Sequence, residues 1–321
     1  MKPKPLVSVV IPAYNAARTL SGTIQSVFEQ TVQDFEIIIV DDGSKDNTLE
    51  IARAIAASDS RVKLIAQPNS GASAARNAGI KAAAGEYIAF LDADDLWLPQ
   101  KLERQIALLN SEKDVAAIQT GAFYVNDNLE VLSIRPCLVP KDVLLETLLF
   151  RSFPALMSTL LVKRSAFDKI GLLDTKLVIL EDWELAIRLS RFCDLKSIEE
   201  PLALYRNYPG NRSRDLSIHI KPGHIILERL FQDPTLPAHI KQRRALIYST
   251  FYRMLSGAAF NIGRYGDSLK FGVKSLLTHP SSLIYMASLP FRRLRRSSSR
   301  ENVSEDYKAA LENFLKRQTA Q

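Results

Sequence analysis

The sequence predicts an α/β fold in which a mostly parallel sheet carries helices on both faces and a helical extension follows. Short apolar runs alternate with helical patterns through the first 92 residues. The runs are continuously apolar, which is typical of strands that are buried on both faces of a parallel sheet. From about residue 215 the helical patterns continue without a strong strand signal. The 321 residues, 46% of them hydrophobic, are enough to bury a substantial core.

Four strand and helix pairs are predicted in the first part of the chain. The expected strands are 6–12, 35–41, 62–66 and 87–92, and the helices after them cover about 20–28, 47–58, 72–85 and the stretch from Pro99. Because a helix separates each strand from the next, the strands are expected to lie parallel in a doubly wound sheet.

The second part of the chain is mixed at first and then helical. Strand-like runs cover 115–125 and 156–162, and helical patterns cover 182–192, 224–231, 240–264 and 267–277. We therefore expect a first domain over 1–214 with halves 1–114 and 115–214, a helical extension over 215–290, and a basic tail over 291–321 that ends in a short helix at 305–317.

The charges separate an acidic body from a basic segment. Residues 1–205 carry 22 Lys and Arg against 27 Asp and Glu, whereas residues 206–300 carry 17 against 4. The histidines all fall in the basic segment, at His219, His224, His239 and His279. Acid–base chemistry in the acidic body therefore depends on carboxylates, and a Ser-His-Asp site is excluded there. The two cysteines, Cys137 and Cys193, lack the spacing of a disulfide framework or a zinc site.

Polar residues follow each of the four predicted strands. They are Tyr14 and Asn15, then Asp41 and Asp42, then residues 68–71, and finally the three acids of "FLDADDLW", Asp92, Asp94 and Asp95. Ligands bind outside the carboxyl ends of the strands in such sheets, so one rim is expected to collect these side chains. The alternative is that each group is only a solvated turn.

The three carboxylates of residues 92–95 lie so close together that their mutual repulsion lowers the stability of the fold. On an extended backbone, Asp92 and Asp94 share one face and Asp95 points the other way. Like charges at this spacing favour a cation between them, and oxygen ligands select Mg²⁺ or Mn²⁺. Since Mg²⁺ is usually shared with substrate phosphates, a phosphorylated ligand is implied. An Asp-rich turn that caps the next helix is the alternative.

Two further features lie on the same predicted rim. Asp41 and Asp42 end a buried strand, and a carboxylate there can accept hydrogen bonds from a nucleobase or a ribose. No GxGxxG or P-loop pattern follows any strand. Arg76, near a helix start in "NSGASAARNAG", can meet a phosphate or hold a carboxylate of the rim.

A separate acidic pair, Glu181 and Asp182, opens the helix predicted in "EDWELAIRL". The helix dipole favours negative charge at this end, which is a complete structural explanation. A base is nevertheless needed for any transfer reaction in a body without histidine, and a carboxylate is the available type.

These motifs together resemble the family 2 inverting glycosyltransferases, which have the GT-A fold. The resemblance covers about residues 6–210 and rests on "VSVVIPAYNAARTL", "FEIIIVDDGSKDNT", "NSGASAARNAGIKAAAGEYIAFLDADD" and "EDWELAIRL" in that order. It implies a Rossmann-like sheet whose residues 1–114 bind a nucleoside diphosphate sugar, often a UDP-sugar, and whose residues 115–214 receive the acceptor. The family's products imply cell-surface polysaccharide or glycolipid synthesis.

The resemblance also implies roles for single residues. The nucleobase of the donor would be bordered by Pro12, Tyr14 and Asn15 and contacted by Asp42, with Asp41 beside it. Asp92 and Asp94 match the family's DxD motif for ribose and divalent metal, with Asp95 adjoining. Asp182 matches the general base, and Arg76 with the metal would offset charge on the leaving diphosphate.

The sequence departs from the family pattern after the motif "EDWELAIRL", which contains the expected general base. Many relatives carry Arg-x-His there, whereas this chain has Arg206 and then Tyr208 in the place of the histidine. Arg206 can still reach the diphosphate. The Gln-x-x-Arg-Trp motif of processive, membrane-embedded relatives is absent, so a single-addition enzyme is expected. The alternatives are a nucleotidyltransferase and a non-catalytic protein that binds a nucleotide sugar.

The basic segment is compatible with three binding partners: nucleic acid, an anionic membrane or a phosphorylated acceptor. No nucleic-acid motif is present, so we expect peripheral attachment to the inner face of the membrane, with "LPFRRLRRSSSR" as the main element. A solvated basic face is the alternative. No apolar run approaches 18 residues and no cleavable signal pattern occurs, so a cytoplasmic location is predicted.

Overall fold

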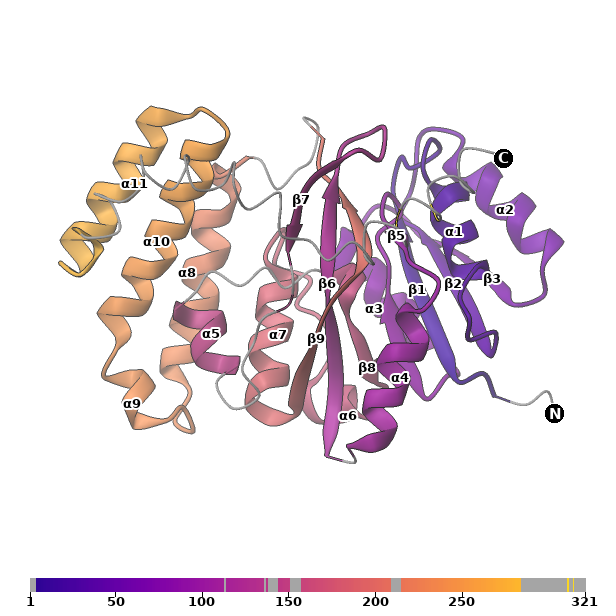
Figure 1. Ribbon diagram of the computed structural model, residues 1–321, viewed down its shortest axis with the longest axis horizontal. Helices are drawn as coiled ribbons and strands as arrows, with labels where there is room; N and C mark the ends of the chain where they lie inside the picture. The colour runs from indigo at the N-terminus through magenta and orange to yellow at the C-terminus, as the bar shows by residue number, and fades with distance from the viewer. Residues whose placement is uncertain are drawn as a thin grey trace. The chain divides into compact units, whose positions relative to one another are not determined.

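A nine-stranded sheet forms the centre of the first part of the chain in the computed structural model (Figure 1). The structure describes residues 4–112, 114–135, 137, 144–150, 157–208, 215–283, 311 and 314. Contacts divide the chain into two units. Unit 1 comprises Met1–Lys141, Ala155–Tyr208 and Val303–Gln321, and unit 2 comprises Asp142–Pro154 and Pro209–Asn302.

The sheet of unit 1 has the strand order β3-β2-β1-β4-β8-β6-β9-β5, with β7 paired to β6. The strands are β1 (Val7–Ala13), β2 (Phe35–Asp41), β3 (Val62–Ala66), β4 (Tyr87–Phe90), β5 (Leu96–Trp97), β6 (Val115–Val125), β7 (Val131–Arg135), β8 (Leu161–Lys163) and β9 (Asp194–Arg206). The first four strands are parallel neighbours, whereas β8 pairs antiparallel with β4 and β6. The predicted mostly parallel α/β sheet is confirmed.

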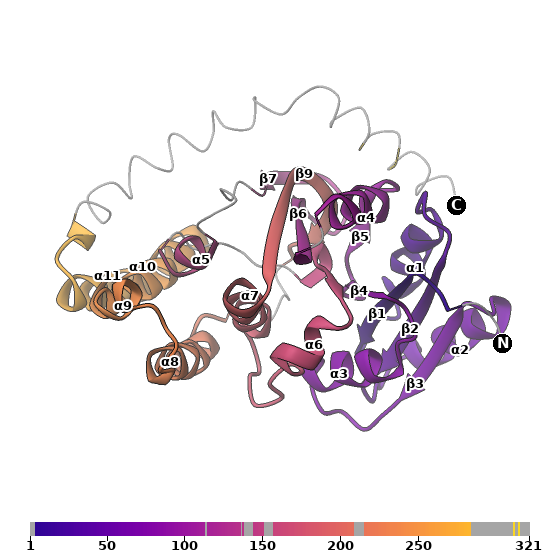
Figure 2. The same ribbon diagram turned by 90° about the horizontal axis from the view of Figure 1, so that it is seen from below.

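Helices cover both faces of the parallel strands (Figure 2). The helices of unit 1 are α1 (Leu20–Phe28), α2 (Thr48–Ser58), α3 (Ala72–Ala82), α4 (Lys101–Ser111), α6 (Ala166–Ile170) and α7 (Glu181–Phe192). Figure 2 shows α1 and α4 on one side of β1 and β4, with α3 on the other. Unit 2 is helical, with α5 (Leu144–Phe150), α8 (Ser217–Gln232), α9 (Ala238–Lys241), α10 (Arg244–Asn261) and α11 (Tyr265–Thr278).

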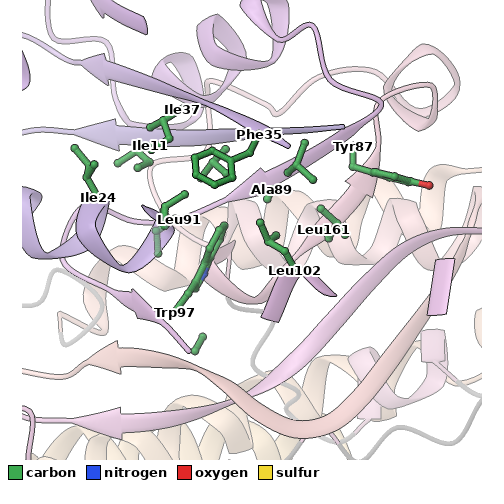
Figure 3. Packing of buried hydrophobic residues seen from close by; sticks show 14 of the residues in the cluster. Ile11, Ile24, Phe35, Ile37, Tyr87, Ala89, Leu91, Trp97, Leu102 and Leu161 are labelled. Carbon is green, nitrogen blue, oxygen red and sulfur yellow. The ribbon is translucent and has the colours of Figure 1, made fainter. Parts of the chain in front are cut away.

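The main core explains why the first strands are apolar at nearly every position. Ile37 of β2 faces the layer of α1 and α4, where it packs in one cluster with Ile11, Ile24 and Leu102 (Figure 3). The next residue, Ile38, faces the other way into a cluster with Val40 and Ala75 of α3. Because alternate side chains point to opposite faces, both faces of β2 are buried and no polar alternation remains.

The structure differs from the sequence prediction at two strands. The apolar run 156–162 was expected to be a strand, but Met157–Thr159 is a short 3-10 helix and β8 begins at Leu161. β9 was not predicted because charged residues interrupt its first half and bulges shift its register against β6. Only Leu311 and Phe314 of the predicted helix at 305–317 are described, and the basic stretch 291–300 lies outside the described residues.

Within the described part of the chain, no helix combines the length and apolar composition needed to cross a bilayer. The expected domain limits at 214 and 290 stay a prediction.

Candidate active site

The carboxyl ends of β1, β2 and β4 bring three of the sequence motifs together. β1 lies between the other two strands and pairs Ala13 with Asp41. The N–H of Asp42 donates to the Ala13 carbonyl at 2.8 Å, and the N–H of Leu91 donates to the Val10 carbonyl at 3.1 Å. The residues that follow these strands therefore share one rim, as parallel pairing requires.

The first segment of the rim contains Pro12, Tyr14 and Asn15. Pro12 is buried in β1, whereas Tyr14 is exposed and Asn15 has a left-handed backbone with φ 51°. The N–H of Asn15 donates to Ser44 Oγ at 3.0 Å, and Asn15 Oδ1 accepts from the Lys45 N–H at 2.8 Å. Asn15 thus fastens the end of β1 to the loop that follows β2.

Asp42 holds the loop that leads into α3. Its carboxylate accepts hydrogen bonds from Gln67 Nε2 at 2.7 Å, from the Ser70 N–H at 2.9 Å and from the Gly71 N–H at 2.8 Å. Its neighbour Asp41 accepts from the Ser44 N–H at 3.3 Å through Oδ2, whereas Oδ1 is buried without a partner. A buried unpaired oxygen is costly, so this atom is suited to accept a bond from a ligand.

Arg76 joins motifs that are far apart in the sequence. Its side chain is 4% exposed, and it places Nη2 2.5 Å from Asp92 Oδ1 and Nη1 2.8 Å from Glu181 Oε1. Burial alone would lower the pKa of Arg76, but the two carboxylates raise it above its ordinary value. The guanidinium therefore stays charged and links the rim of the sheet to the start of α7.

The stretch 92–95 is a turn and not the extended backbone on which Asp92 and Asp94 would share one face. The Asp95 N–H donates to the Asp92 carbonyl at 3.0 Å, and the Thr23 hydroxyl lies 2.9 Å from the carbonyl oxygens of Ala93 and Asp95. These contacts draw the backbone toward α1, and the three carboxylates consequently point to three different partners.

Each acid of this turn has its own environment. Asp92 pairs with Arg76, while Asp94 Oδ2 accepts from the Tyr208 hydroxyl at 3.3 Å. Asp95 is buried, and its two oxygens accept from Ser158 Oγ at 2.5 Å and from the Arg206 N–H at 3.0 Å. Asp95 is therefore tied into the protein on both oxygens, whereas Asp92 and Asp94 remain partly exposed at the rim.

The electrostatics of the turn favour a positive ligand. Burial, followed by the charge of Asp92, raises the pKa of Asp94 to about 6. Burial, followed by the charges of Asp94 and Asp92, raises the pKa of Asp95 well above its usual range. Among the described residues no group of three or more His, Cys, Asp or Glu is arranged to hold a metal. The donor set still fits a hard cation that takes two carboxylate oxygens and completes its shell from a substrate.

Asp182 lies in the first turn of α7 and follows Glu181 in the sequence. The preceding Leu180 has a left-handed backbone with φ 66°, a conformation that costs energy in a non-glycine residue and often marks a functional site. Asp182 Oδ1 accepts from the Trp183 N–H at 2.7 Å. Burial, followed by the charge of Glu181, raises the pKa of Asp182 to about 7. A carboxylate with this pKa can take up a proton near neutral pH.

Three of the residues at the site had no assigned role in the sequence interpretation. Glu181 was explained by the helix dipole, but it also pairs with Arg76. Tyr208 was noted only as a replacement for histidine, yet its hydroxyl reaches Asp94. Ser158 lay inside a predicted strand and gave no signal. Its hydroxyl donates to Asp95 and accepts the Asp92 N–H at 3.1 Å, so it holds both ends of the turn.

We expect Ser158→Ala to lower the free energy of unfolding by about 1–3 kcal/mol, because the buried Asp95 carboxylate loses a hydrogen-bond donor. Chemical denaturation of both proteins measures the difference. Ser190→Ala is the matched control, since the Ser190 hydroxyl donates to the Ile187 carbonyl within α7. An equal effect of the two substitutions would contradict the special role of Ser158.

The sequence pattern of the Glycosyl transferase family 2 matches residues 8–171, which is more than half of the chain. The chain belongs to this family. The matched residues include the rim motifs through Asp95 and end before α7.

Curated relatives agree with this family. An uncharacterized glycosyltransferase of Nostoc sp. is 35% identical over 213 residues, which cover 64% of this chain and 66% of that protein. The glucosyltransferase WfgD of Escherichia coli is named for UDP-Glc and an α-D-GlcNAc-diphosphoundecaprenol acceptor, and it is 46% identical over 105 residues, covering 32% of this chain and 41% of WfgD. The first three curated relatives are covered over 40% to 66% of their own lengths.

Solved structures share the fold at low sequence identity. The structure of S. aureus TarS 1–349 has a TM-score of 0.61 at 16% identity. The match covers 97% of this chain and 91% of the TarS chain. TarS has also been solved with UDP-GlcNAc, at a TM-score of 0.62. The mannosyltransferase PcManGT of Pyrobaculum calidifontis, in complex with GDP-Man and Mn²⁺, has a TM-score of 0.59 at 16% identity and covers 97% of this chain and 86% of its own. The predicted GT-A fold is confirmed.

Proposed function

We propose that this protein is a metal-dependent inverting glycosyltransferase that moves a sugar from a nucleoside diphosphate sugar, a UDP-sugar in the first instance, to an acceptor hydroxyl. The observation that carries this proposal is the buried Arg76, which joins Asp92 to Glu181 beside Asp182. A donor site and a carboxylate with a pKa of about 7 are thereby held together by one side chain.

The donor is proposed to bind along the rim of β1 and β2. Tyr14 is exposed at this rim beside Pro12 and Asn15, and Asp41 offers a buried oxygen without a partner. Asp42 keeps the neighbouring loop in place, so we assign the direct contact with the base to Asp41 and the support of the site to Asp42. The UDP-Glc in the name of WfgD and the UDP-GlcNAc bound by TarS support a uridine nucleotide.

Asp92 and Asp94 are proposed to hold a divalent cation, Mn²⁺ or Mg²⁺. Both are partly exposed at the rim, and Asp94 has a raised pKa that a neighbouring cation would reverse. We assign Asp95 to the support of this pair, since both of its oxygens are engaged by protein groups. When bound, such a cation offsets charge on a leaving diphosphate. The Mn²⁺ in the PcManGT complex supports this assignment.

In the proposed reaction, Asp182 removes the proton of the acceptor hydroxyl. The acceptor oxygen forms a bond to the anomeric carbon from the face opposite the diphosphate. The bond from that carbon to the phosphate oxygen breaks, and its electron pair leaves with the diphosphate. Arg76 and Arg206 supply fixed positive charge on the donor side. The anomeric centre is inverted because attack and departure take place on opposite faces.

The pH profile should report the ionisation of Asp182. A general base acts in its deprotonated form, so kcat/KM is expected to fall about tenfold for each pH unit below about 7 and to level off above it. Initial rates between pH 5 and 9 at fixed Mn²⁺ measure the profile. A rate that stays flat through the acid range would contradict the assignment of Asp182.

The acceptor is proposed to be a saccharide or a lipid-linked sugar in cell-surface polysaccharide or glycolipid synthesis. The lipid-linked acceptor named for WfgD supports this class. We place the enzyme in the cytoplasm, on the inner face of the membrane, where such acceptors are accessible. In this proposal residues 1–214 hold the transferase, residues 215–290 the helical extension and residues 291–321 the basic tail.

A donor panel tests the function. Full-length protein is incubated with UDP-glucose, UDP-GlcNAc or GDP-mannose and a GlcNAc-diphospholipid acceptor, with Mn²⁺ or with EDTA. We expect one donor to be consumed with Mn²⁺ and none with EDTA. Formation of a nucleotide sugar from UTP and a sugar phosphate would instead indicate a nucleotidyltransferase. Binding of a donor without turnover under every condition would indicate a non-catalytic protein.

A further inference from the structure

Helix α11 carries a row of large apolar side chains that are exposed to solvent. The row consists of Tyr265, Leu269, Val273 and Leu277, of which Leu269 is 65% and Leu277 82% exposed. Residues four apart lie one above the other on a helix, so the row forms one continuous stripe along α11. Such a stripe is larger than the scattered apolar side chains of an ordinary surface.

The orientation of this stripe is set by the packing of α11 against α10 within unit 2 (Figure 1). Ser268 and Ser275 of α11 are buried, as are Phe271 and Gly272 between them. Ser256 Oγ of α10 donates to the Ser268 carbonyl at 2.7 Å, and the hydroxyls of Ser249 and Ser275 lie 3.0 Å apart. The buried face is thus committed to α10, and the apolar stripe lies on another side of the helix.

Positive charge borders the stripe. Lys270 and Lys274 are exposed and follow the apolar row around the helix. Asp267 is the only carboxylate in α11, and it forms an ion pair with Arg264 at 2.6 Å. Residues 215–283 carry 9 Lys and Arg against 4 Asp and Glu, and the sequence 284–300 adds five arginines and no acid. The partner of this surface is therefore expected to be both apolar and anionic.

We propose that the exposed face of α11 docks on a bilayer that contains anionic phospholipid. Apolar side chains in a row beside lysines are the pattern of a helix that lies in the interface of a membrane. A second copy of the chain would bring the same excess of positive charge to the contact, whereas anionic headgroups neutralise Lys270 and Lys274. The proposal rests on the membrane location proposed above and does not depend on the transfer reaction.

Co-sedimentation of the full-length chain with vesicles tests the docking. Vesicles of phosphatidylcholine with or without phosphatidylglycerol are mixed with wild type and with the double variant Leu269→Glu and Leu277→Glu. Binding to the anionic vesicles is expected to weaken about tenfold or more, because two inserted side chains are lost. Val131→Glu is the matched control, since Val131 is an exposed apolar residue of β7 in unit 1 and should leave binding unchanged.

A second variant tests the charge. Lys270→Gln with Lys274→Gln is expected to weaken binding to the anionic vesicles by about fivefold per lysine and to leave binding to neutral vesicles unchanged. All substituted positions are exposed, and the contact of the Lys274 ammonium with the Tyr252 ring, 5.5 Å from its centre, contributes little at an exposed site, so thermal unfolding should stay close to that of wild type. Donor consumption in vesicle-free solution should also match, which separates a failure of docking from a failure of the transferase proposal.

Three results would overturn the docking proposal. One is full vesicle binding by the Leu269 and Leu277 double variant. This result would count against α11 even if a separate variant, changed only at the arginines of 292–296, lost all binding. Another is an equal loss in the Val131 control. The third concerns sedimentation velocity: the wild type sediments as a dimer, whereas the double variant sediments as a monomer and still binds vesicles. The stripe would then join two copies of the chain.

Discussion

Asp182→Asn is expected to lower the rate of sugar transfer by about 10²–10⁴-fold while donor binding is retained. Asn has nearly the same shape as Asp but cannot take a proton from the acceptor hydroxyl. The donor contact proposed at Asp41 and the cation site proposed at Asp92 and Asp94 lie outside α7, so the substitution does not remove them. Steady-state transfer and titration of the UDP-sugar separate the two effects.

The control for this prediction is Asp168→Asn. Asp168 is an exposed carboxylate in α6 of the same unit and takes no part in the described rim. Its substitution should leave both transfer and donor binding unchanged. If Asp182→Asn retained full activity, Asp182 would not be the base, and a loss of donor binding would place the residue in the donor site instead.

Arg76→Met is expected to lower the free energy of unfolding by about 3–5 kcal/mol, because it leaves two carboxylates without their buried cation. Arg76 is 4% exposed, and its partners Asp92 and Glu181 have side chains 31% and 16% exposed. Met fills a similar volume, so the loss should come from the charge and its hydrogen bonds. Urea denaturation of the variant and the wild type measures the difference.

Two comparisons isolate the role of this charge. Arg61→Met removes an ion pair with Asp59 in which the arginine side chain is 35% exposed, together with the contacts of the guanidinium with the Phe28 and Phe35 rings, and it is expected to cost about 1–2 kcal/mol. Adding Glu181→Gln to Arg76→Met should recover part of the loss, since one uncompensated carboxylate is removed. If Arg76→Met cost no more than Arg61→Met, Arg76 would not be the link between the two motifs.

The fold could be predicted from the sequence where burial repeats along a strand. β1, β2 and β4 are apolar at nearly every position because helices cover both of their faces, and this pattern is visible without a structure. β9 lacks the pattern. Its first half carries Glu199 and Glu200, and its register against β6 shifts twice near Gly121.

The site could be predicted only as far as its residues follow strand ends or open a helix. Asp42, Asp92 and Asp182 were identified as candidates in this way. Ser158 could not be found, because its role comes from contacts with Asp92 and Asp95, which lie more than sixty residues away along the chain. The turn at 92–95 was considered only as the alternative, and its inward course could not be predicted, since the hydroxyl that draws it inward belongs to a separate helix.

The stereochemistry of the product tests the central proposal most directly. UDP-α-glucose, or whichever donor of the panel is consumed, is incubated with the full-length protein, Mn²⁺ and the lipid-linked acceptor, and the new linkage is assigned by ¹H NMR. A direct displacement with Asp182 as base predicts that an α-linked donor gives only a β-linked product. An α-linked product would contradict the proposed mechanism.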